Sequence, residues 1–212
     1  MASDVEKAII NATSNEGPAG TVFAPLALRS VKQTKSSITL TWNKTSKASK
    51  YVIYGNLEGK KNKMKKITSV KSSAKTKTIK KIAGKKLKKG KYYKFIIMAV
   101  DGDNSAISLS KAAHVAVKGG KAGNYKSVSV KKSVITKAGK MKMGSKLSIG
   151  AKAVKASKLK VKKYRALKYM STDTLVATVS SKGVITAKAT GACYVYAYAQ
   201  NGVYRKIKVI VK

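Results

Sequence analysis

Apolar and polar residues alternate along short segments over most of the chain. The clearest case lies in 91–101, where Tyr93, Phe95, Ile97 and Ala99 occupy every second position. Side chains two residues apart share one face of a strand, so this segment is predicted to be a strand with a buried face. The lysines in and before it, which are predicted to stay in water, are Lys85, Lys86, Lys88, Lys89, Lys91 and Lys94.

Segments of the same kind recur through the first half of the chain. They lie at 37–44, 51–56, 63–70, 75–82 and 114–119, and none is separated from the next by a segment of helical period. Short strands at intervals of roughly ten residues are typical of a β-sandwich or barrel. Alternation with polar residues on one face favours antiparallel pairing, so the predicted fold class is all-β.

The second half repeats this pattern after a glycine-rich linker at 119–124. Strands are predicted at 126–136 and 145–154, followed by a hairpin that joins 176–179 to 184–187. In the next strand, Tyr194, Tyr196 and Tyr198 share one face. The opposite face carries small apolar residues and is the better candidate for the core: Cys193, Val195, Ala197 and Ala199.

The N-terminal segment, residues 1–21, differs from the rest because it carries three of the seven acidic residues. Ser3 and Glu6 have the spacing of a capping box, which indicates a short helix over about 4–12. A disordered lead-in is the alternative. The predicted organisation is thus a segment at 1–21, a domain at 22–118, the linker at 119–124 and a domain at 125–212.

Residues 22–118 resemble a fibronectin type III domain. The residues that carry the resemblance are Pro25, Trp42, Leu87, Gly90, Tyr93, Phe95, Ile97 and Ala99. The resemblance implies that the Tyr93 hydroxyl is bonded to backbone a few residues upstream, as in a tyrosine corner. Lys89 departs from the pattern, because the family usually has proline there.

Residues 125–212 resemble a bacterial immunoglobulin-like domain of group 2. The resemblance rests on Ser171, Asp173, 176–179, 183–187, Gly191 and Ala197, and a long basic insertion at 152–165 departs from it. Together the two resemblances imply two tandem immunoglobulin-like β-sandwiches. They also imply a module of the kind found in cell-surface proteins of Gram-positive gut bacteria, hence an extracellular protein, either at the cell surface or secreted.

The charge is extreme, with 47 Lys and Arg against 7 Asp and Glu and a formal net charge of +40. Only Arg29, Arg165 and Arg205 are arginine. Reading of base edges relies on arginine, so nucleic acid is an improbable partner, and a diffuse anionic polymer fits better. Both predicted domains are basic, with 24 basic against 3 acidic residues in 22–118 and 21 against 1 in 125–212.

The chemistry of most enzymes and metal sites is missing from this sequence. His114 is the only histidine, and Cys193, the only cysteine, is predicted to be a small buried residue. Asp101 and Asp103 flank Gly102 in what is predicted to be a plain turn rather than a cation site. No cofactor, metal, catalytic residue or membrane span is expected, and residues 1–20 do not resemble a signal peptide.

The leading hypothesis is a non-enzymatic module for spacing, display and adhesion that attaches by charge to anionic polymers of the cell wall or of host glycans. The candidate binding residues are Lys85, Lys86, Lys88, Lys89, Lys91, Lys158, Lys160, Lys162, Lys163 and Arg165. The alternative is a specific carbohydrate- or protein-binding adhesin that uses Tyr51, Tyr54, Tyr164 and Tyr169 as stacking surfaces. A third interpretation is a cationic coat that serves solubility alone. A monomer is expected.

Overall fold

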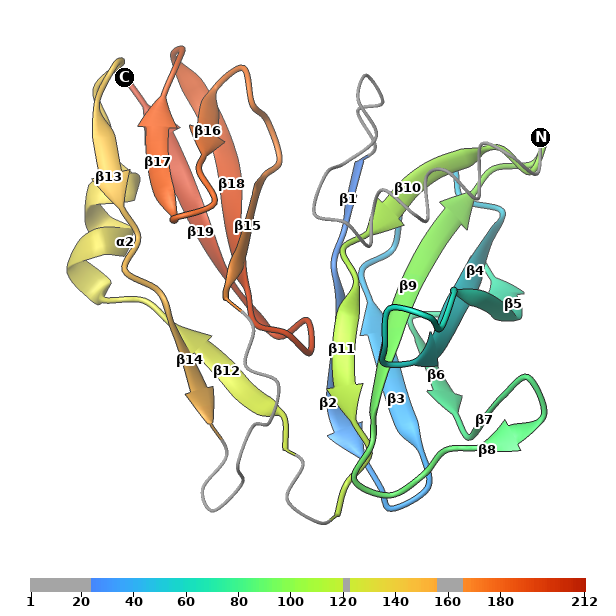
Figure 1. Ribbon diagram of the computed structural model, residues 1–212. Coiled ribbons are helices and arrows are strands. Elements are labelled where there is room, and N and C mark those ends of the chain that lie inside the picture. The colour runs from blue at the N-terminus through green and yellow to red at the C-terminus, as the bar shows by residue number, and fades with distance from the viewer. Residues whose placement is uncertain (1–23, 120–122, 156–165) are drawn as a thin grey trace. The chain divides into compact units, whose positions relative to one another are not determined.

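A computed structural model of the chain describes residues 24–119, 123–155 and 166–212 (Figure 1). Nearly all regular structure in these ranges is β, so the predicted all-β class is confirmed. The chain forms two compact units, unit 1 at 1–124 and unit 2 at 125–212. The predicted N-terminal segment 1–21 lies outside the described residues. No helix among the described residues is long and apolar enough to cross a bilayer.

Unit 1 contains one large sheet whose strands run in the order β1-β10-β9-β4-β5, with β11 also paired to β9. All of these pairs are antiparallel except β1 with β10. The strands are β1 (Ala24–Leu26), β4 (Lys50–Leu57), β5 (Lys65–Lys71), β9 (Tyr92–Val100), β10 (Ala106–Ser110) and β11 (Ala113–Ala116).

A second sheet in unit 1 has the order β2-β3-β6, and a small hairpin pairs β7 with β8. These strands are β2 (Leu28–Gln33), β3 (Ile38–Trp42), β6 (Thr76–Ile79), β7 (Lys81–Ile82) and β8 (Lys85–Lys86). Leu40 and Trp42 from this sheet share one buried cluster with Tyr51, Phe95 and Ile97 from the large sheet. The two sheets therefore enclose a single core, which makes unit 1 a β-sandwich.

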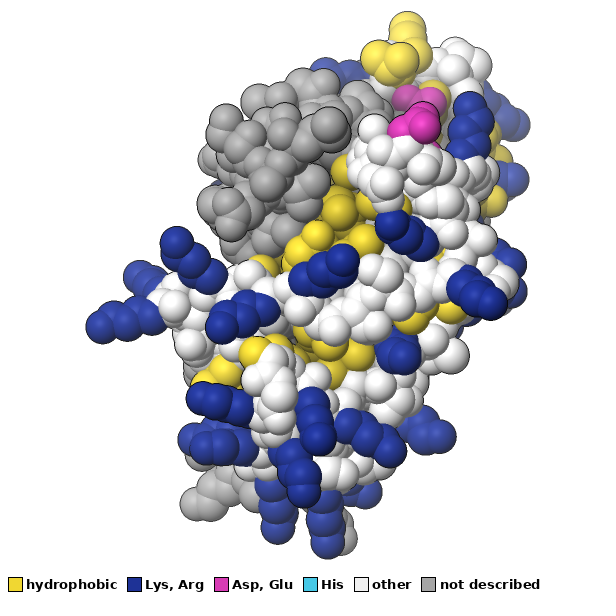
Figure 2. Space-filling model, turned by 90° about the vertical axis from the view of Figure 1, so that its right-hand side faces the viewer, with side chains coloured by type: hydrophobic (Ala, Val, Ile, Leu, Met, Phe, Trp, Pro, Cys, Tyr) yellow, Lys and Arg dark blue, Asp and Glu magenta, His cyan; other side chains and the backbone are white. Residues whose placement is uncertain are grey.

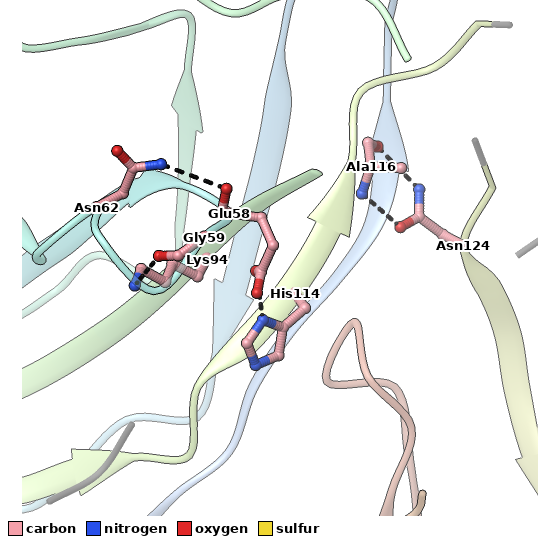
Figure 3. Close-up of polar contacts among 7 residues, drawn as sticks. All are labelled: Glu58, Gly59, Asn62, Lys94, His114, Ala116 and Asn124. Atoms are coloured by element: carbon pink, nitrogen blue, oxygen red, sulfur yellow. Dashed lines mark hydrogen bonds and ion pairs between the residues drawn. The ribbon is translucent and has the colours of Figure 1, made fainter. Parts of the chain in front are cut away.

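Strand β9 is buried on both faces, which the alternating pattern did not predict. Tyr93, Phe95, Ile97 and Ala99 lie in the core as expected. On the opposite face, Tyr92, Ile96, Met98 and Val100 are also buried. Lys94 is only half-exposed, because its Nζ donates a hydrogen bond to the Gly59 carbonyl at 3.3 Å (Figure 3). The prediction that Lys94 stays fully in water was therefore wrong.

Unit 2 contains two three-stranded sheets and one two-stranded sheet, in the orders β13-β17-β16, β15-β18-β19 and β12-β14. Their core combines Ile185 from β17 with Val195 from β18 and Ile207 from β19. The strands are β12 (Tyr125–Ser129), β13 (Lys146–Ser148), β14 (Lys152–Lys155), β15 (Lys168–Ser171), β16 (Ala177–Val179), β17 (Val184–Ala187), β18 (Gly191–Tyr198) and β19 (Tyr204–Val211).

The second half of the strand predicted at 126–136 is a helix, α2 (Lys132–Ala138). Val134 and Ile135 favour a strand by propensity, but Ala138 is fully buried in the core of unit 2. Gly139 closes the helix, donating its N–H to the Ile135 carbonyl at 3.2 Å. Tertiary packing overrides local propensity in this short segment.

The predicted hairpin in unit 2 is confirmed, and so is the orientation of the following strand. β16 and β17 pair antiparallel with Val179 opposite Ile185, and Gly183 at φ 75° occupies the turn between them. In β18, Cys193, Val195 and Ala197 face the core, as predicted. Burial raises the pKa of the Cys193 thiol, which keeps it protonated.

Candidate polyanion-binding surface

The densest group of lysines in the described chain lies on residues 80–91, here called the cationic hairpin. It consists of the β7–β8 hairpin and the loop that leads into β9 (Figure 1). Every lysine in it is exposed: Lys80, Lys81, Lys85, Lys86, Lys88, Lys89 and Lys91. The structure thus brings together the first five candidate binding residues, on a segment that projects their side chains into water.

Two apolar side chains and one tyrosine hold the cationic hairpin in place. Ile82 and Leu87 are buried and belong to the core of unit 1. The Tyr93 hydroxyl accepts a hydrogen bond from the Lys88 N–H at 2.8 Å, as the resemblance to a fibronectin type III domain implied. Gly90, at φ 70°, donates its N–H to the Val117 carbonyl at 3.1 Å. The lysines are therefore displayed from an ordered loop.

Lys89, which stands where proline was expected, contributes to the packing of the cationic hairpin through its aliphatic stem. A Cβ placed on Gly119 would lie within 2.5 Å of Lys89 Cγ, so the stem covers the space that a side chain at 119 would need. Gly119 also has φ 124°, a conformation that other residues rarely adopt. The contact fixes the stem of Lys89 while its side chain as a whole remains exposed.

Other lysines of unit 1 lie on sheet edges, where they have a structural role. β5 pairs only with β4 and β6 only with β3, so each strand is an edge of its sheet. Lys65, Lys66 and Lys71 are exposed on β5. Charged side chains on edge strands oppose pairing with another chain, which accounts for part of the lysine content without a ligand.

Cationic side chains are spread over the surface rather than gathered at one point. Figure 2 shows dark-blue side chains across the whole face drawn, with one small magenta group. Among the described residues, Asp101, Asp103 and Asp173 form no ion pair with a lysine. The positive charge is therefore largely uncompensated by fixed acidic partners. The other five candidate binding residues, Lys158, Lys160, Lys162, Lys163 and Arg165, lie outside the described residues.

A largely buried contact joins the His114 ring on β11 to the Glu58 carboxylate after β4. The His114 Nδ1 lies 2.7 Å from Glu58 Oε2, and the two side chains are 10% and 9% exposed (Figure 3). The Glu58 N–H also donates to the Tyr92 carbonyl at 2.9 Å. The sequence placed His114 on a strand but did not pair it with Glu58, because 56 residues separate them. This pair links β11 to the segment after β4, and both side chains lie mostly out of water.

The Asp101 turn, the candidate cation site of the sequence, is closed by its own backbone. The Asp101 carboxylate accepts the N–H groups of Asp103 and Ser105 at 3.1 and 2.9 Å, so it closes its own turn, as predicted. No group of three histidine, cysteine or acidic side chains that could hold a metal ion occurs in the parts of the chain that the structure describes.

The tyrosines proposed as stacking surfaces are only partly accessible. Tyr51 is fully buried and its hydroxyl accepts the Thr45 N–H at 2.8 Å, so its assignment as a stacking residue was wrong. Its alternation with Val52 and Ile53 in β4 left its face ambiguous in the sequence. Tyr54 and Tyr169 are half-buried, and the Tyr169 ring lies against Gly183. Tyr164 lies outside the described residues.

No protein-family model matches the chain, and no curated protein matches it. Solved structures that resemble it include pectate lyase Pel3 from Pectobacterium carotovorum, at 22% identity and TM-score 0.35 over 43% of this chain and 27% of that one. Another is pectate lyase PelI from Erwinia chrysanthemi, at 17% identity and TM-score 0.36 over 44% and 28%. A fibronectin type III domain of human collagen XX matches at 18% identity and TM-score 0.36 over 47% and 96%.

These similarities are too low to assign a family or an activity. The chain spans less than a third of the length of the two pectate lyases. The assignments of 22–118 to fibronectin type III and of 125–212 to bacterial immunoglobulin-like group 2 therefore stay predictions, while the all-β sandwich architecture of unit 1 rests on its own strand pairing and core.

Proposed function

We propose that the chain is a non-enzymatic pair of immunoglobulin-like modules that spaces or displays other domains and adheres by charge to anionic polymers. The observation that carries this proposal is the exposed, ordered cationic hairpin on a molecule with a formal net charge of +40. Fifteen lysines and no acidic residue occur between positions 60 and 91. Binding of a polyanion gains free energy from many such contacts at once, because each contact releases counterions.

The proposed partner class is an anionic polysaccharide or other cell-wall polymer, at the cell surface or in the medium around a bacterium. Lysine favours this class, because its ammonium group is a hydrated point charge that accepts many anionic geometries. The proposed domain types are fibronectin type III for unit 1 and bacterial immunoglobulin-like group 2 for unit 2. The hydrogen bond from the Lys88 N–H to the Tyr93 hydroxyl supports the first of these.

Chromatography on immobilised alginate tests the proposal. We expect retention at low ionic strength that falls steeply as NaCl is added, because salt screens charges beyond about 8 Å at physiological ionic strength. A column of uncharged dextran is the control and should not retain the protein. Absent retention on alginate, or retention that salt does not change, would contradict electrostatic adhesion.

A specific adhesin is the second candidate, and the half-exposed side chains of Tyr54 and Tyr169 are the observation that keeps it open. Its signature is a sharp preference for one structure on a glycan array that survives about 0.5 M salt, where charge attraction is largely screened. Diffuse binding to all acidic glycans, lost at high salt, favours the first candidate instead.

A further inference from the structure

The two most exposed large apolar side chains among the described residues lie at the same end of unit 2. Leu175 is 81% exposed and Met143 is 65% exposed. Figure 1 shows that the turn before β13, the turn between β15 and β16, and the segment after β17 all lie at this end. Single exposed apolar residues are common on protein surfaces, and these two share one end of a small unit.

Backbone hydrogen bonds place the segments that carry these two residues on either side of the end of β17. The Gly144 N–H donates to the Ala187 carbonyl at 3.0 Å, and the Lys188 N–H donates to the Val176 carbonyl at 2.9 Å. Met143 and Leu175 are the chain neighbours of Gly144 and Val176. The segments that carry them are therefore separated by about two strand spacings, roughly 10 Å.

Both turns are ordered, so the apolar side chains are held away from the core. Asp173 Oδ1 accepts the N–H groups of Leu175 at 2.9 Å and Val176 at 3.3 Å, which closes the turn at Leu175. The Met143 N–H donates to the Lys212 carbonyl at 3.3 Å, and the Ser145 N–H donates to the Lys142 carbonyl at 3.1 Å. Fixed backbone at both turns leaves the two side chains projecting in water.

Exposed lysines occur in the segments at this end of unit 2, together with the single carboxylate of Asp173. Lys142 precedes Met143, Lys188 follows the end of β17, and Lys212 contacts the Met143 turn. An anionic lipid bilayer combines a negatively charged surface with an apolar interior just below it. Leucine and methionine enter such an interior, while lysine extends its ammonium group to the headgroups.

We propose that this surface, made of Lys142, Met143, Leu175, Lys188 and Lys212, is a docking site for anionic lipid bilayers. A second copy of the chain does not fit, because each copy carries a formal charge of +40 and would repel the other. A soluble anionic polymer would bind the lysines alone and would leave Met143 and Leu175 in water. An anionic bilayer matches both the lysines and the apolar side chains.

Vesicle co-sedimentation of the full chain tests this docking site. We expect binding to vesicles of phosphatidylcholine mixed with phosphatidylglycerol and little binding to phosphatidylcholine alone. The double variant Met143→Ser with Leu175→Ser should lose at least about tenfold in affinity for the mixed vesicles, because it removes two apolar side chains without a change of charge. Val31→Ser is the matched control, since Val31 is 60% exposed on unit 1 and should have no effect.

A tryptophan placed at 175 reports directly whether this side chain enters the bilayer. Trp42 is the only native tryptophan and is buried, at 3% exposure, so its emission is a constant background. Leu175→Trp should shift its emission to shorter wavelength on mixed vesicles, and should not shift when soluble alginate is added. The second result separates this docking site from the adhesion proposed above, which alginate retention tests independently.

Three outcomes would overturn the docking site. The first is unchanged vesicle binding by the double serine variant, which would leave charge as the sole cause of binding. The second is a tryptophan at 175 whose emission stays the same on mixed vesicles. The third is a concentration-dependent dimer in gel filtration that the double serine variant abolishes, which would assign the surface to a second copy of the chain.

Discussion

Tyr93 connects the fold of unit 1 to the display of its lysines. Its ring belongs to the buried core, and its hydroxyl accepts the N–H of Lys88 in the cationic hairpin. One side chain thus contributes to packing and also holds the loop on which the positive charge is densest. Loss of its hydroxyl would leave a partly buried N–H without a partner.

We expect Tyr93→Phe to lower the free energy of unfolding by about 1–3 kcal/mol, because the Lys88 N–H loses its acceptor. Urea denaturation followed by circular dichroism measures this change. Tyr198→Phe is the matched control: its hydroxyl is buried and has no hydrogen-bond partner among the described residues, so removal should cost little or nothing. Equal effects of the two substitutions would show that the hydrogen bond to Lys88 contributes nothing.

The single histidine of the chain, His114, is buried together with Glu58, one of its few acidic residues. Only four of the seven acidic residues lie in described parts of the chain, and Glu58 is the one bound to the single histidine. Both side chains are about nine-tenths buried, so either one alone would leave an uncompensated polar group inside. The pair therefore joins β11 to the segment that follows β4 inside unit 1.

At the scale of elements, the cationic hairpin is one part of a positive charge that extends over both units. Residues 22–118 and 125–212 carry similar charge, and β5 adds exposed lysines at a sheet edge. These lysine side chains are chemically equivalent and extend in many directions. A long anionic polymer can therefore contact several groups of them at once. The hairpin should then contribute in proportion to its charge.

We expect glutamine substitution of Lys80, Lys81, Lys85 and Lys86 to lower the salt concentration of elution from alginate by a modest amount. A matched variant with four exposed lysines of unit 2 replaced, Lys140, Lys146, Lys182 and Lys208, should have a similar effect, because each loses four positive charges. Elution of the two variants at clearly different salt concentrations would contradict a distributed surface. In that case the hairpin would be a dedicated site.

At the scale of the whole molecule, the net charge opposes the compact state. A formal charge of +40 on 212 residues creates self-repulsion that few fixed acidic groups offset. Buried apolar clusters in both units, the main ones around Phe95 and around Val195, hold the chain folded against it. The balance between repulsion among the lysines and burial of apolar side chains should therefore depend on ionic strength.

We expect the Tm to rise as NaCl is increased from low to physiological concentration, since screening weakens repulsion between exposed lysines. Differential scanning calorimetry over a salt series measures the shift. Sodium alginate at low ionic strength should raise the Tm further, because binding to the folded state stabilises it. A Tm that is constant or falls with NaCl would show that charge repulsion does not limit stability.

The sequence by itself determined the all-β class, the hairpin of β16 and β17, and one core-facing side each of β9 and β18. These features follow from alternation and from turn residues such as Gly183, which act over a few positions. The resemblance to a fibronectin type III domain also predicted the hydrogen bond between the Tyr93 hydroxyl and the backbone a few residues upstream.

Only the tertiary structure decided features that depend on residues distant in the chain. The pairing of His114 with Glu58, the burial of Tyr51 and the second buried face of β9 arise from contacts that local alternation does not encode. Helix α2 forms despite β-branched residues because Ala138 packs into the core. The placement of the Met143 and Leu175 turns on either side of the end of β17 is equally non-local, since 32 positions separate the two residues in the chain.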